Sequence, residues 1–552
     1  MSAPERFDVV IVGSGAGGAP VAQVLAQAGV RVLVLEKGPR HGVQDFLHDE
    51  ISICRRNFWV PPLEDDPHVV AREDGSITQT TAGWIAQCVG GGTVHMSGFF
   101  FRLHPDDFRL ASAYGPMDGS TAIDWPFGYE DLAPYYERVE REVGVSGDVS
   151  KNPFAPPRSS PFPYLPVVNH PFASHIDKVG AELGLHPFPT PRAIITQGDG
   201  HDRGACVYCS LCGSYGCEVN AKSSTLASLI PKAEATGNCV VKPGCMVKRV
   251  LMRTDGRASG VEYVDDTGVH TVEADVVVVA ATAIESARLL LLSTSQGHPA
   301  GLGNRHGQVG QNLCLSTLGQ VTGFLQYDRF SPEMQEVLRN SAPFLGRALQ
   351  DRYEAPGVGI GKGGTFHLLW SHPNPIHAAE QLTRDGGRLV YGEELTRRLS
   401  HRFRDGRELE VECFSEWLPT PDCHVTLDPD ATDRFGLPAA RITVGRRHPS
   451  DKAGSQVLVD EGARLLGALG ATEITTHSVG GETWVLQHGT CRMGTDPRTS
   501  VTTPQGNLHD VENVYVTCGG ALPSSGGVPS TFTIMANAFR VADGLLARLK
   551  KT

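Results

Sequence analysis

The chain has no long hydrophobic run, no long basic run and no leader-like start, and each absence removes a class of protein. The longest apolar runs, such as residues 275–284, are too short to cross a membrane as a helix. The formal net charge of -12 argues against nucleic acid as a partner. No basic segment and apolar stretch open the sequence, so we expect no signal peptide and a cytoplasmic location. A periplasmic location is expected only if a partner protein carries an export signal that serves both that partner and this chain.

The cysteines do not form the pattern of a secreted disulfide scaffold. There are 13 of them, an odd number, scattered through 552 residues. Hydrophobic residues make up 40% and charged residues 20% of the chain, as in globular proteins. The length indicates two, or at most three, structural units.

The N-terminal stretch predicts a dinucleotide site. A buried strand at 7–12 precedes glycines with GxGxxG spacing, a helical pattern that stops at Gly29, and a second strand at 30–35. The glycines are Gly13, Gly15 and Gly18, and the second strand ends in Glu36. In order, they permit a tight turn, a close approach of the backbone to a pyrophosphate and close helix–strand packing. The helix N-terminus favours phosphate, and the acid can accept hydrogen bonds from a ribose.

A second glycine run has the same spacing but a different context. Gly359, Gly361 and Gly364 follow no buried strand, and no helical pattern comes after them. Lys362 is typical of a P-loop, yet Gly363 stands where a P-loop needs Ser or Thr. We therefore expect a loop.

Four cysteines lie within twelve positions of "GACVYCSLCGSYGCEVNAKSS". Cys206, Cys209, Cys212 and Cys217 follow the spacing C-x2-C-x2-C-x4-C. Three consecutive short steps wrap one compact centre, which favours an iron–sulfur cluster, 3Fe-4S or 4Fe-4S, over the separated knuckles of structural zinc. A tetrahedral zinc site, disulfides and four unconnected thiols are the alternatives.

Six segments in order carry a resemblance to a known family. They are the N-terminal fingerprint, "CVGGGTVH", "DWPFGYEDLAPYYERVE", "AATAIESARLLLLS", "GTCRMG" and "NVYVTCGGALPSSGGVPSTFTIMANAFRVAD". Together they resemble the glucose-methanol-choline (GMC) family of FAD-dependent oxidoreductases. Within it, the chain looks most similar to the branch of gluconate 2-dehydrogenase large subunits, glucoside 3-dehydrogenases and pyranose oxidases.

The resemblance implies an α/β fold, with a Rossmann-like FAD-binding domain and a discontinuous α+β substrate domain. The expected FAD-binding parts are residues 1–310 and 471–552, and the substrate domain is residues 311–470, with a helix from about 451 to 469. The first part includes a Pro-rich connector at 150–172 and the cysteine loop at 204–224.

The resemblance also implies one FAD along the first βαβ unit. Val247 is expected near the adenine, and the turn holding Gly91 and Thr93 near the flavin. His95 stands where pyranose oxidases carry a flavin-linked histidine. We expect its ring to pack beside the flavin, with covalent attachment as the alternative.

The catalytic end departs from the family pattern. GMC enzymes usually place a histidine three residues before the glycine of "GTCRM" and a second His or Asn in a turn similar to "GGVNPT". Here these positions hold Leu486 and Pro529, which cannot take a proton. His488 is the predicted base for the hydroxyl proton. Its predicted supports are His477, Ser530 or Asn537. The alternative is that the proton abstraction is weak or absent and the chemistry has changed.

The resemblance implies a dehydrogenase that oxidises a hydroxyl of a sugar, sugar acid, glycoside or related alcohol by hydride transfer to flavin. Electrons would then leave singly through the cluster to an external acceptor, with a small subunit, a cytochrome or a quinone-linked chain as the expected partner. One alternative is an FAD oxidase of the pyranose oxidase kind that uses O2. Another is an electron-transfer flavoprotein with no alcohol substrate of its own.

Overall fold

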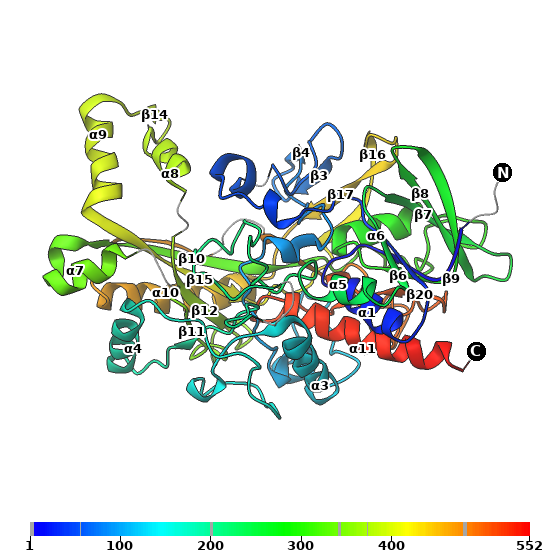
Figure 1. Ribbon diagram of the computed structural model, residues 1–552, viewed down its shortest axis with the longest axis horizontal. Coiled ribbons are helices and arrows are strands. Elements are labelled where there is room, and N and C mark those ends of the chain that lie inside the picture. Colours follow the sequence, from blue (N-terminus) through cyan, green and yellow to red (C-terminus); the bar gives the residue numbers. More distant parts are fainter. Residues whose placement is uncertain are drawn as a thin grey trace.

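The computed structural model describes residues 5–55, 57–198, 203–340, 344–371, 374–478 and 483–551. Within them the chain forms two seven-stranded sheets, a four-stranded sheet and a small hairpin, with helices packed around them (Figure 1).

The first large sheet is built around the N-terminal strand. Its order is β6-β2-β1-β9-β8-β7, and β20 also pairs with β9. The strands are β1 (Glu5–Val12), β2 (Val32–Leu35), β6 (Cys239–Lys242), β7 (Met246–Met252), β8 (Ala258–Asp265), β9 (Gly268–Val279) and β20 (Val514–Val516). The pairs around β1 and β2 are parallel, whereas β7, β8 and β9 form an antiparallel meander. A parallel β1–β2 pair joined by a helix is the unit that the fingerprint predicts.

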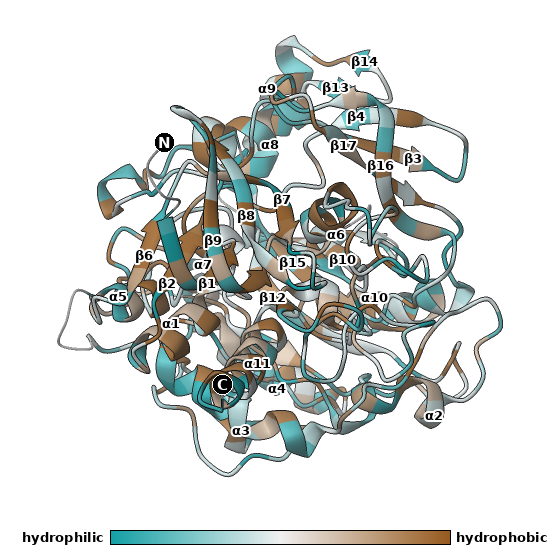
Figure 2. Ribbon diagram, turned by 90° about the vertical axis from the view of Figure 1, so that its right-hand side faces the viewer, coloured by the Kyte–Doolittle hydropathy of each residue, from teal (hydrophilic) through white to brown (hydrophobic). Residues whose placement is uncertain are grey.

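Helices cover this sheet. Helix α1 (Ala19–Gln27) packs against α5 (Leu229–Glu234) and α11 (Thr531–Leu549), and α11 packs in turn against α3 (Tyr129–Val139). Helix α6 (Ala283–Leu292) follows β9 directly. Figure 2 shows α6 as predominantly hydrophobic, in keeping with its run of buried leucines. The C-terminal helix therefore completes the layer that the N-terminal helix begins.

The second large sheet has the order β18-β10-β15-β12-β11-β5, with β19 also paired with β10. The strands are β5 (Phe188–Pro189), β10 (Cys314–Gln326), β11 (Arg347–Leu349), β12 (Gly364–Trp370), β15 (Gly406–Ser415), β18 (Thr472–His477) and β19 (Thr483–His488). Helix α10 (Pro449–Ala468) packs on β10 and β15, and α4 (Phe172–Glu182) and α7 (Pro332–Arg339) lie nearby. This sheet has its own apolar core, separate from the core of the first sheet.

The remaining elements join the two halves or project from them. The four-stranded sheet pairs β3 (His68–Arg72) and β4 (Ile77–Thr80) with β16 (Cys423–Thr432) and β17 (Pro438–Val444). An arm of α8 (Pro375–Leu382), β13 (Arg384–Asp385), β14 (Arg388–Leu389) and α9 (Gly392–Ser400) projects at the opposite end of the molecule from both chain termini (Figure 1). Helix α2 (Leu110–Tyr114) is short. Among the described helices, none has the length and apolar character needed to span a membrane.

The fold class agrees with the expectation, and several elements lie where the sequence placed them. The expected helix at 451–469 is α10, and the second glycine run is a loop that leads into β12 at Gly364. The sheets do not follow the expected domain boundaries strictly, because β18 begins after residue 470 yet pairs with β10. Strands β16 and β17 lie inside 311–470 but pair with the N-terminal β3.

Candidate active site

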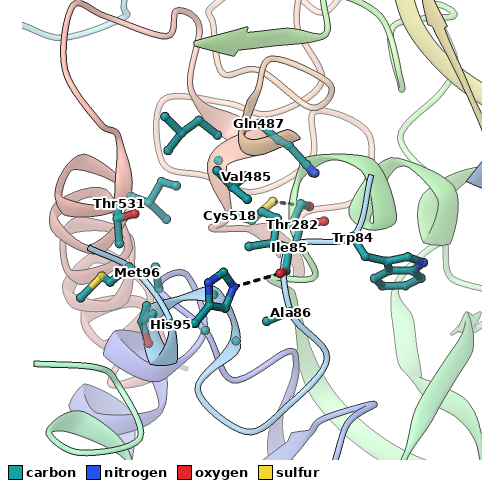
Figure 3. A pocket seen from close by; sticks show the side chains of 18 of the residues that line it. Trp84, Ile85, Ala86, His95, Met96, Thr282, Val485, Gln487, Cys518 and Thr531 are labelled. Atoms are coloured by element: carbon teal, nitrogen blue, oxygen red, sulfur yellow. Dashed lines mark hydrogen bonds between the residues drawn. The ribbon is translucent and has the colours of Figure 1, made fainter. Parts of the chain in front are cut away.

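A cavity of about 630 Å³ lies between the two large sheets. Its walls come from two glycine-rich turns, the first at Gly13 to Gly17 and the second at Gly91 to Thr93, and from the junction of β9 and α6. The facing strands β10, β12 and β15 and the C-terminal segment complete them. Figure 3 shows side chains from these separate segments converging on one space. The N-terminal fingerprint and the C-terminal motif therefore contribute to one site.

The three fingerprint glycines lie at the first turn. Gly13 has φ +97°, and a Cβ there would lie 2.7 Å from the carbonyl oxygen of Ala280. A Cβ on Gly18 would lie 1.9 Å from the carbonyl oxygen of Gly13, so this turn requires a glycine at that position. Gly15 lines the cavity and faces Gly91 of the second turn. The two backbones form a cradle without side chains, next to the start of α1.

Glu36 at the end of β2 lines the cavity beside this cradle. Its Oε2 accepts hydrogen bonds from the backbone N–H of Ser14 (3.1 Å) and from the Ser14 hydroxyl (2.6 Å). The Ser14 hydroxyl oxygen accepts in turn from the N–H of Gly90 (2.9 Å), which ties the two turns together. Burial raises the pKa of Glu36, partly against these hydrogen bonds.

The second turn holds the other predicted cofactor contacts. Thr93, His95 and Val247 all line the cavity. The Thr93 hydroxyl donates to the carbonyl oxygen of Gly90 (2.6 Å), which stabilises the turn itself. The Nε2 of His95 lies 3.0 Å from the carbonyl oxygen of Ile85, as Figure 3 shows. His95 therefore lies with its ring held at the cavity wall.

A charged wall at the dinucleotide end has no counterpart in the sequence-based prediction. Lys37, next to Glu36, lines the cavity, pairs with Asp66 and lies over the ring of Trp84. Burial lowers the pKa of Lys37 to about 7. Arg288 on α6 also lines the cavity and pairs with Asp433 at 2.7 Å. Because both partners lie far away in the sequence, only the position of Lys37 next to Glu36 could have signalled this wall.

The two positions where the family carries catalytic side chains do line the cavity. Leu486 on β19 and Pro529 in the C-terminal turn are both among the lining residues. Their apolar side chains cannot accept a proton there. Ser530 lines the cavity as well, and its buried hydroxyl has no hydrogen-bond partner among the described residues.

Two other predicted catalytic residues lie outside the lining. His488 is fully buried opposite Cys314 on β10, and its ring nitrogens have no hydrogen-bond partner in the described part of the chain. Burial lowers its pKa to about 4, so the ring is neutral at ordinary pH. Asn537 is buried on α11 and accepts hydrogen bonds from Arg540. The cavity gives no geometric support to His488 or Asn537 as catalytic residues. The predicted support His477 is exposed on β18.

Two carboxylates that the sequence reasoning missed line the cavity instead. Glu410 and Glu412 alternate along β15 with Leu409 and Val411, which are buried in the core on the other face. The pattern "ELEVEC" has the period of a strand with one polar face, which is typical of a face exposed to water. Here the polar face looks into the cavity, which the pattern alone does not reveal.

The cysteine loop lies directly against the cavity. Gly213 and Ser214 line the cavity, and the Ser214 N–H donates to the carbonyl oxygen of His95 (2.8 Å). Backbone N–H groups of Tyr208 and Lys222 point at the sulfurs of Cys206 (3.4 Å) and Cys217 (3.5 Å). The residues Tyr208, Ser210 and Ser214 adopt left-handed φ values of 58°, 62° and 67°. Such a wrapped, strained loop needs a constraint to hold it.

The loop does not show a finished metal site. All thirteen cysteines are free thiols. In the described ranges, no group of three or more His, Cys, Asp or Glu side chains is arranged to hold a metal ion. Burial raises the pKa of Cys206 to about 12 and also raises the pKa of Cys212. The iron–sulfur prediction therefore has no direct support from the arrangement of the ligands.

Comparison with known proteins gives matches to families and to individual relatives. Residues 173–318 and 419–538 match the GMC oxidoreductase family, and residues 11–46 match an NAD(P)-binding Rossmann-like domain. The chain is 32% identical to 2-methyl-1,2-propanediol dehydrogenase of Mycolicibacterium austroafricanum, over 99% of this chain and 96% of that protein. It is 32% identical to paromamine 6'-oxidase of Streptomyces fradiae, over 98% of this chain and 92% of that one.

Two further comparisons bear on the branch and on the fold. Identity to the gluconate 2-dehydrogenase flavoprotein of Pantoea cypripedii is 25%, over 96% of this chain and 92% of that protein. The prediction that the chain belongs to this family is therefore confirmed. The finer prediction of the gluconate dehydrogenase branch is not, because the diol dehydrogenase and the paromamine 6'-oxidase are more similar to the chain. The crystal structure of a pyridoxine 4-oxidase superposes with a TM-score of 0.62 at 16% identity, covering 98% of this chain and 99% of that one.

The chain belongs to the GMC oxidoreductase family. It is an FAD-dependent oxidoreductase that acts on CH–OH donors, with alcohol or sugar-like hydroxyl groups as its substrates. The cavity fits FAD, because its side-chain-free glycine cradle suits a pyrophosphate and Glu36 is placed to meet a ribose.

Proposed function

We propose that the protein is a dehydrogenase that oxidises a hydroxyl of a polyol, sugar, sugar acid or related alcohol and passes the electrons out through an iron–sulfur cluster held by Cys206, Cys209, Cys212 and Cys217. The relatives named as a propanediol dehydrogenase and a gluconate 2-dehydrogenase flavoprotein support the substrate class and the dehydrogenase reaction. The final acceptor would be a small subunit, a cytochrome or a quinone-linked chain.

The observation that carries the cluster is the charge around the cysteines. Lys222 is buried, and its Nζ donates to the carbonyl oxygens of Cys212 (2.7 Å) and Tyr215 (2.6 Å). Arg192 is buried as well, stacks over Phe99 and lies close enough to Cys206 and Cys212 to interact with them electrostatically. Among the described residues neither cation has a carboxylate within ion-pair distance, although Glu412 acts on Arg192 from further away.

Two such buried cations are costly unless a negative charge compensates them. Thiolates bound to a metal centre carry that negative charge, whereas neutral thiols do not. The N–H groups directed at two of the sulfurs would donate hydrogen bonds to the metal-bound sulfurs and so tune the potential of such a centre. The loop also contacts the carbonyl of His95 at the cavity wall, so a cluster there would lie next to the flavin cavity.

FAD, when bound, accepts a hydride from the carbon that carries the hydroxyl. The chain itself supplies the binding and the surroundings. The glycine turns and Glu36 hold the dinucleotide end, and His95 lies at the wall of the second turn. Apolar side chains, among them Leu486 and Pro529, exclude water from the other end. The Ser530 hydroxyl, which has no partner among the residues that the structure describes, can bind a substrate oxygen.

The first experiment is an analysis of iron, zinc and acid-labile sulfide per flavin in protein purified without air. We expect about three to four irons with matching sulfide. Cys212→Ser should lose the metal and keep the flavin, whereas Cys239→Ser, on the buried strand β6, should keep both. Zinc without iron, or no metal at all, would overturn the electron route.

One alternative is favoured by the names of two relatives. The paromamine 6'-oxidase and the 6'''-hydroxyparomomycin C oxidase are 32% identical to this chain and are named as oxidases. Rapid peroxide formation with substrate in air would support an oxidase. The apolar residues Leu486 and Pro529 favour the other alternative, an electron-transfer flavoprotein. Failure of a broad panel of alcohols to reduce the flavin without air would support that second alternative.

A further inference from the structure

The strand β15 places two carboxylates at the roof of the cavity. Glu410 and Glu412 are two residues apart, so both side chains lie on the same face of the sheet, and both line the cavity. Glu412 lies opposite Gln320 on β10 and opposite His367 on β12. The acidic pair therefore occupies the middle of the sheet rather than its edge.

These carboxylates differ in how they are neutralised. Their neighbour Glu408 binds Arg402 through both oxygens. The Oε2 of Glu412 lies 2.8 Å from Nε2 of His367. Glu410 accepts a hydrogen bond from the side-chain amide of Gln320, and no Lys, Arg or His of the described chain lies within 4.0 Å of it. The pair is thus left with negative charge that the protein does not balance.

The surroundings of the two acids strengthen the attraction between this negative charge and a cation. The two acids are only partly exposed, with 25% of the Glu412 side chain accessible, and Leu318, Leu369 and Phe414 place apolar surface around them. The cations that line the cavity, Lys37 and Arg288, are already paired with Asp66 and Asp433. A charge in such a place attracts an opposite charge far more strongly than it would in water. Burial, and next the neighbouring Glu412, raise the pKa of Glu410 to about 7.

A second observation points to a ligand in the same cavity. The residue Ser530 is 2% exposed and lines the cavity, yet its hydroxyl has no partner among the described residues. A buried hydroxyl without a partner costs free energy, so a ligand that bonds it is favoured. The Thr365 N–H donates to the carbonyl oxygen of Gly527 (3.0 Å), which fixes the turn that carries Ser530 against β12.

We propose that Glu410 and Glu412 form a subsite for a positively charged group, so that the alcohol oxidised by this protein carries an amine. The inference rests on the proposed function, because it assumes that an alcohol enters this cavity. A protonated amine donates charge-assisted hydrogen bonds to the two carboxylates, and Ser530 bonds a hydroxyl of the same molecule. The carbon skeleton between them contacts the apolar wall.

The test compares two polyols that differ in one charged group. N-methyl-D-glucamine and D-glucitol are titrated into the FAD-loaded protein at low salt, and binding is followed by calorimetry, which does not require turnover. We expect the glucamine to bind roughly tenfold or more tightly, with an advantage that decreases as salt is added. Glu410→Gln and Glu412→Gln keep the shape of the side chains and should each remove most of that advantage.

Glu408→Gln is the matched control, since it lies on the same strand and face but is neutralised by Arg402 and does not line the cavity. This variant should keep the preference for the glucamine. Equal binding of the two polyols, no measurable binding of the glucamine, or a preference that survives both cavity substitutions would each overturn the subsite. Folding of each variant is checked by its flavin content and melting temperature.

A separate measurement keeps this inference apart from the proposed function. Reduction of the flavin without air is followed with a panel of neutral alcohols and polyols. If neutral alcohols reduce the flavin and no preference for the cation exists, the subsite is wrong and the oxidoreductase function stands. If the glucamine binds but no alcohol, charged or neutral, reduces the flavin, the function fails and the charge selectivity stands.

Discussion

Single side chains set the proton balance of the cavity. Burial holds the pKa of Glu410 at about 7, with Glu412 as the next cause, and holds the pKa of His488 at about 4. His488 is therefore neutral across the physiological range, whereas Glu410 changes its charge within it. Of these two groups only Glu410 faces the cavity. The pH dependence of ligand binding is accordingly expected to follow a carboxylate.

The binding of N-methyl-D-glucamine should therefore depend on pH. Glu410 is neutral below its raised pKa, so the subsite loses a negative charge as the pH falls through about 7. Between about pH 8 and pH 6 we expect affinity to decrease by up to about tenfold, while the ligand stays protonated. Calorimetry over this range measures the step, and Glu410→Gln should remove it. The charged and titratable groups that face Glu410 and Glu412 from the packed elements are Glu408, His367, His477 and Arg192.

Lys362, which the sequence alone placed in a loop, is buried and holds the catalytic end together. Its Nζ lies 2.6 Å from Asp107 and 2.7 Å from Glu416. Glu416 in turn accepts the N–H groups of Ser525 and Gly526, in the turn that leads to Pro529. The lysine thereby connects the second glycine run to the geometry of the cavity.

Lys362→Met should destabilise the protein by about 3–5 kcal/mol, because it leaves two buried carboxylates without their cation. Urea unfolding monitored by fluorescence measures the loss. Lys452→Met is the control, since Lys452 is exposed on α10 and a substitution there should stay within about 0.5 kcal/mol. Equal stability of the two variants would show that the buried contacts of Lys362 with the two carboxylates contribute nothing to stability.

At the scale of the element, the β1–α1 unit depends on a contact between backbones. The turn bends so tightly that position 18 lies against the carbonyl of Gly13, and α1 begins at the next residue. Helix α11 is less demanding, because a Cβ added to Gly544 on its exposed side would have no neighbouring atom within 4 Å. The two glycines should therefore respond to the same substitution in opposite ways.

Gly18→Ala should abolish the tight turn and with it the flavin, since the added carbon would overlap the Gly13 carbonyl oxygen. The ratio of flavin absorbance to protein absorbance in the purified variant measures the loss. Gly544→Ala should instead keep the flavin and stabilise the protein by roughly 0.5–1 kcal/mol, as alanine does in an exposed helix. Flavin retained at the wild-type ratio in Gly18→Ala would contradict this account of the turn.

At the scale of the molecule, the cavity separates two bodies with their own apolar cores. One core gathers around β1 and β9, and the other lies between β10, β15 and α10. Walls of the cavity come from both, so a ligand that fills it adds contacts to each half. The cofactor should therefore act as a structural link between the halves as well as a reactant.

Removal of FAD should lower the melting temperature by several degrees. A ligand present at about 100 times its Kd stabilises the folded state by about 2.7 kcal/mol, and unfolding of either half destroys the site. Calorimetric scans of the FAD-loaded and FAD-free protein measure the shift, and added free FAD should restore it. Identical melting curves would mean that the cofactor does not connect the two halves.

The family, the dinucleotide unit and the position of several elements could be predicted from the sequence, because local chemistry fixes them. The tight turn of the fingerprint needs glycines at positions 13 and 18, and the helix expected at about 451–469 is α10, Pro449–Ala468. The four clustered cysteines share one short loop because they are close together in the sequence.

The lining of the cavity was decided only by the tertiary structure. "ELEVEC" specifies a strand with one polar face, but the packing of α10 against the other face is what turns Glu410 and Glu412 towards the cavity. His488 is the base that the sequence predicts, yet its pairing with β10 places the ring in the core. Local sequence determines which element forms and what chemistry it carries. Which side chains face the cavity depends on contacts between residues far apart in the chain, and no local pattern encodes those contacts.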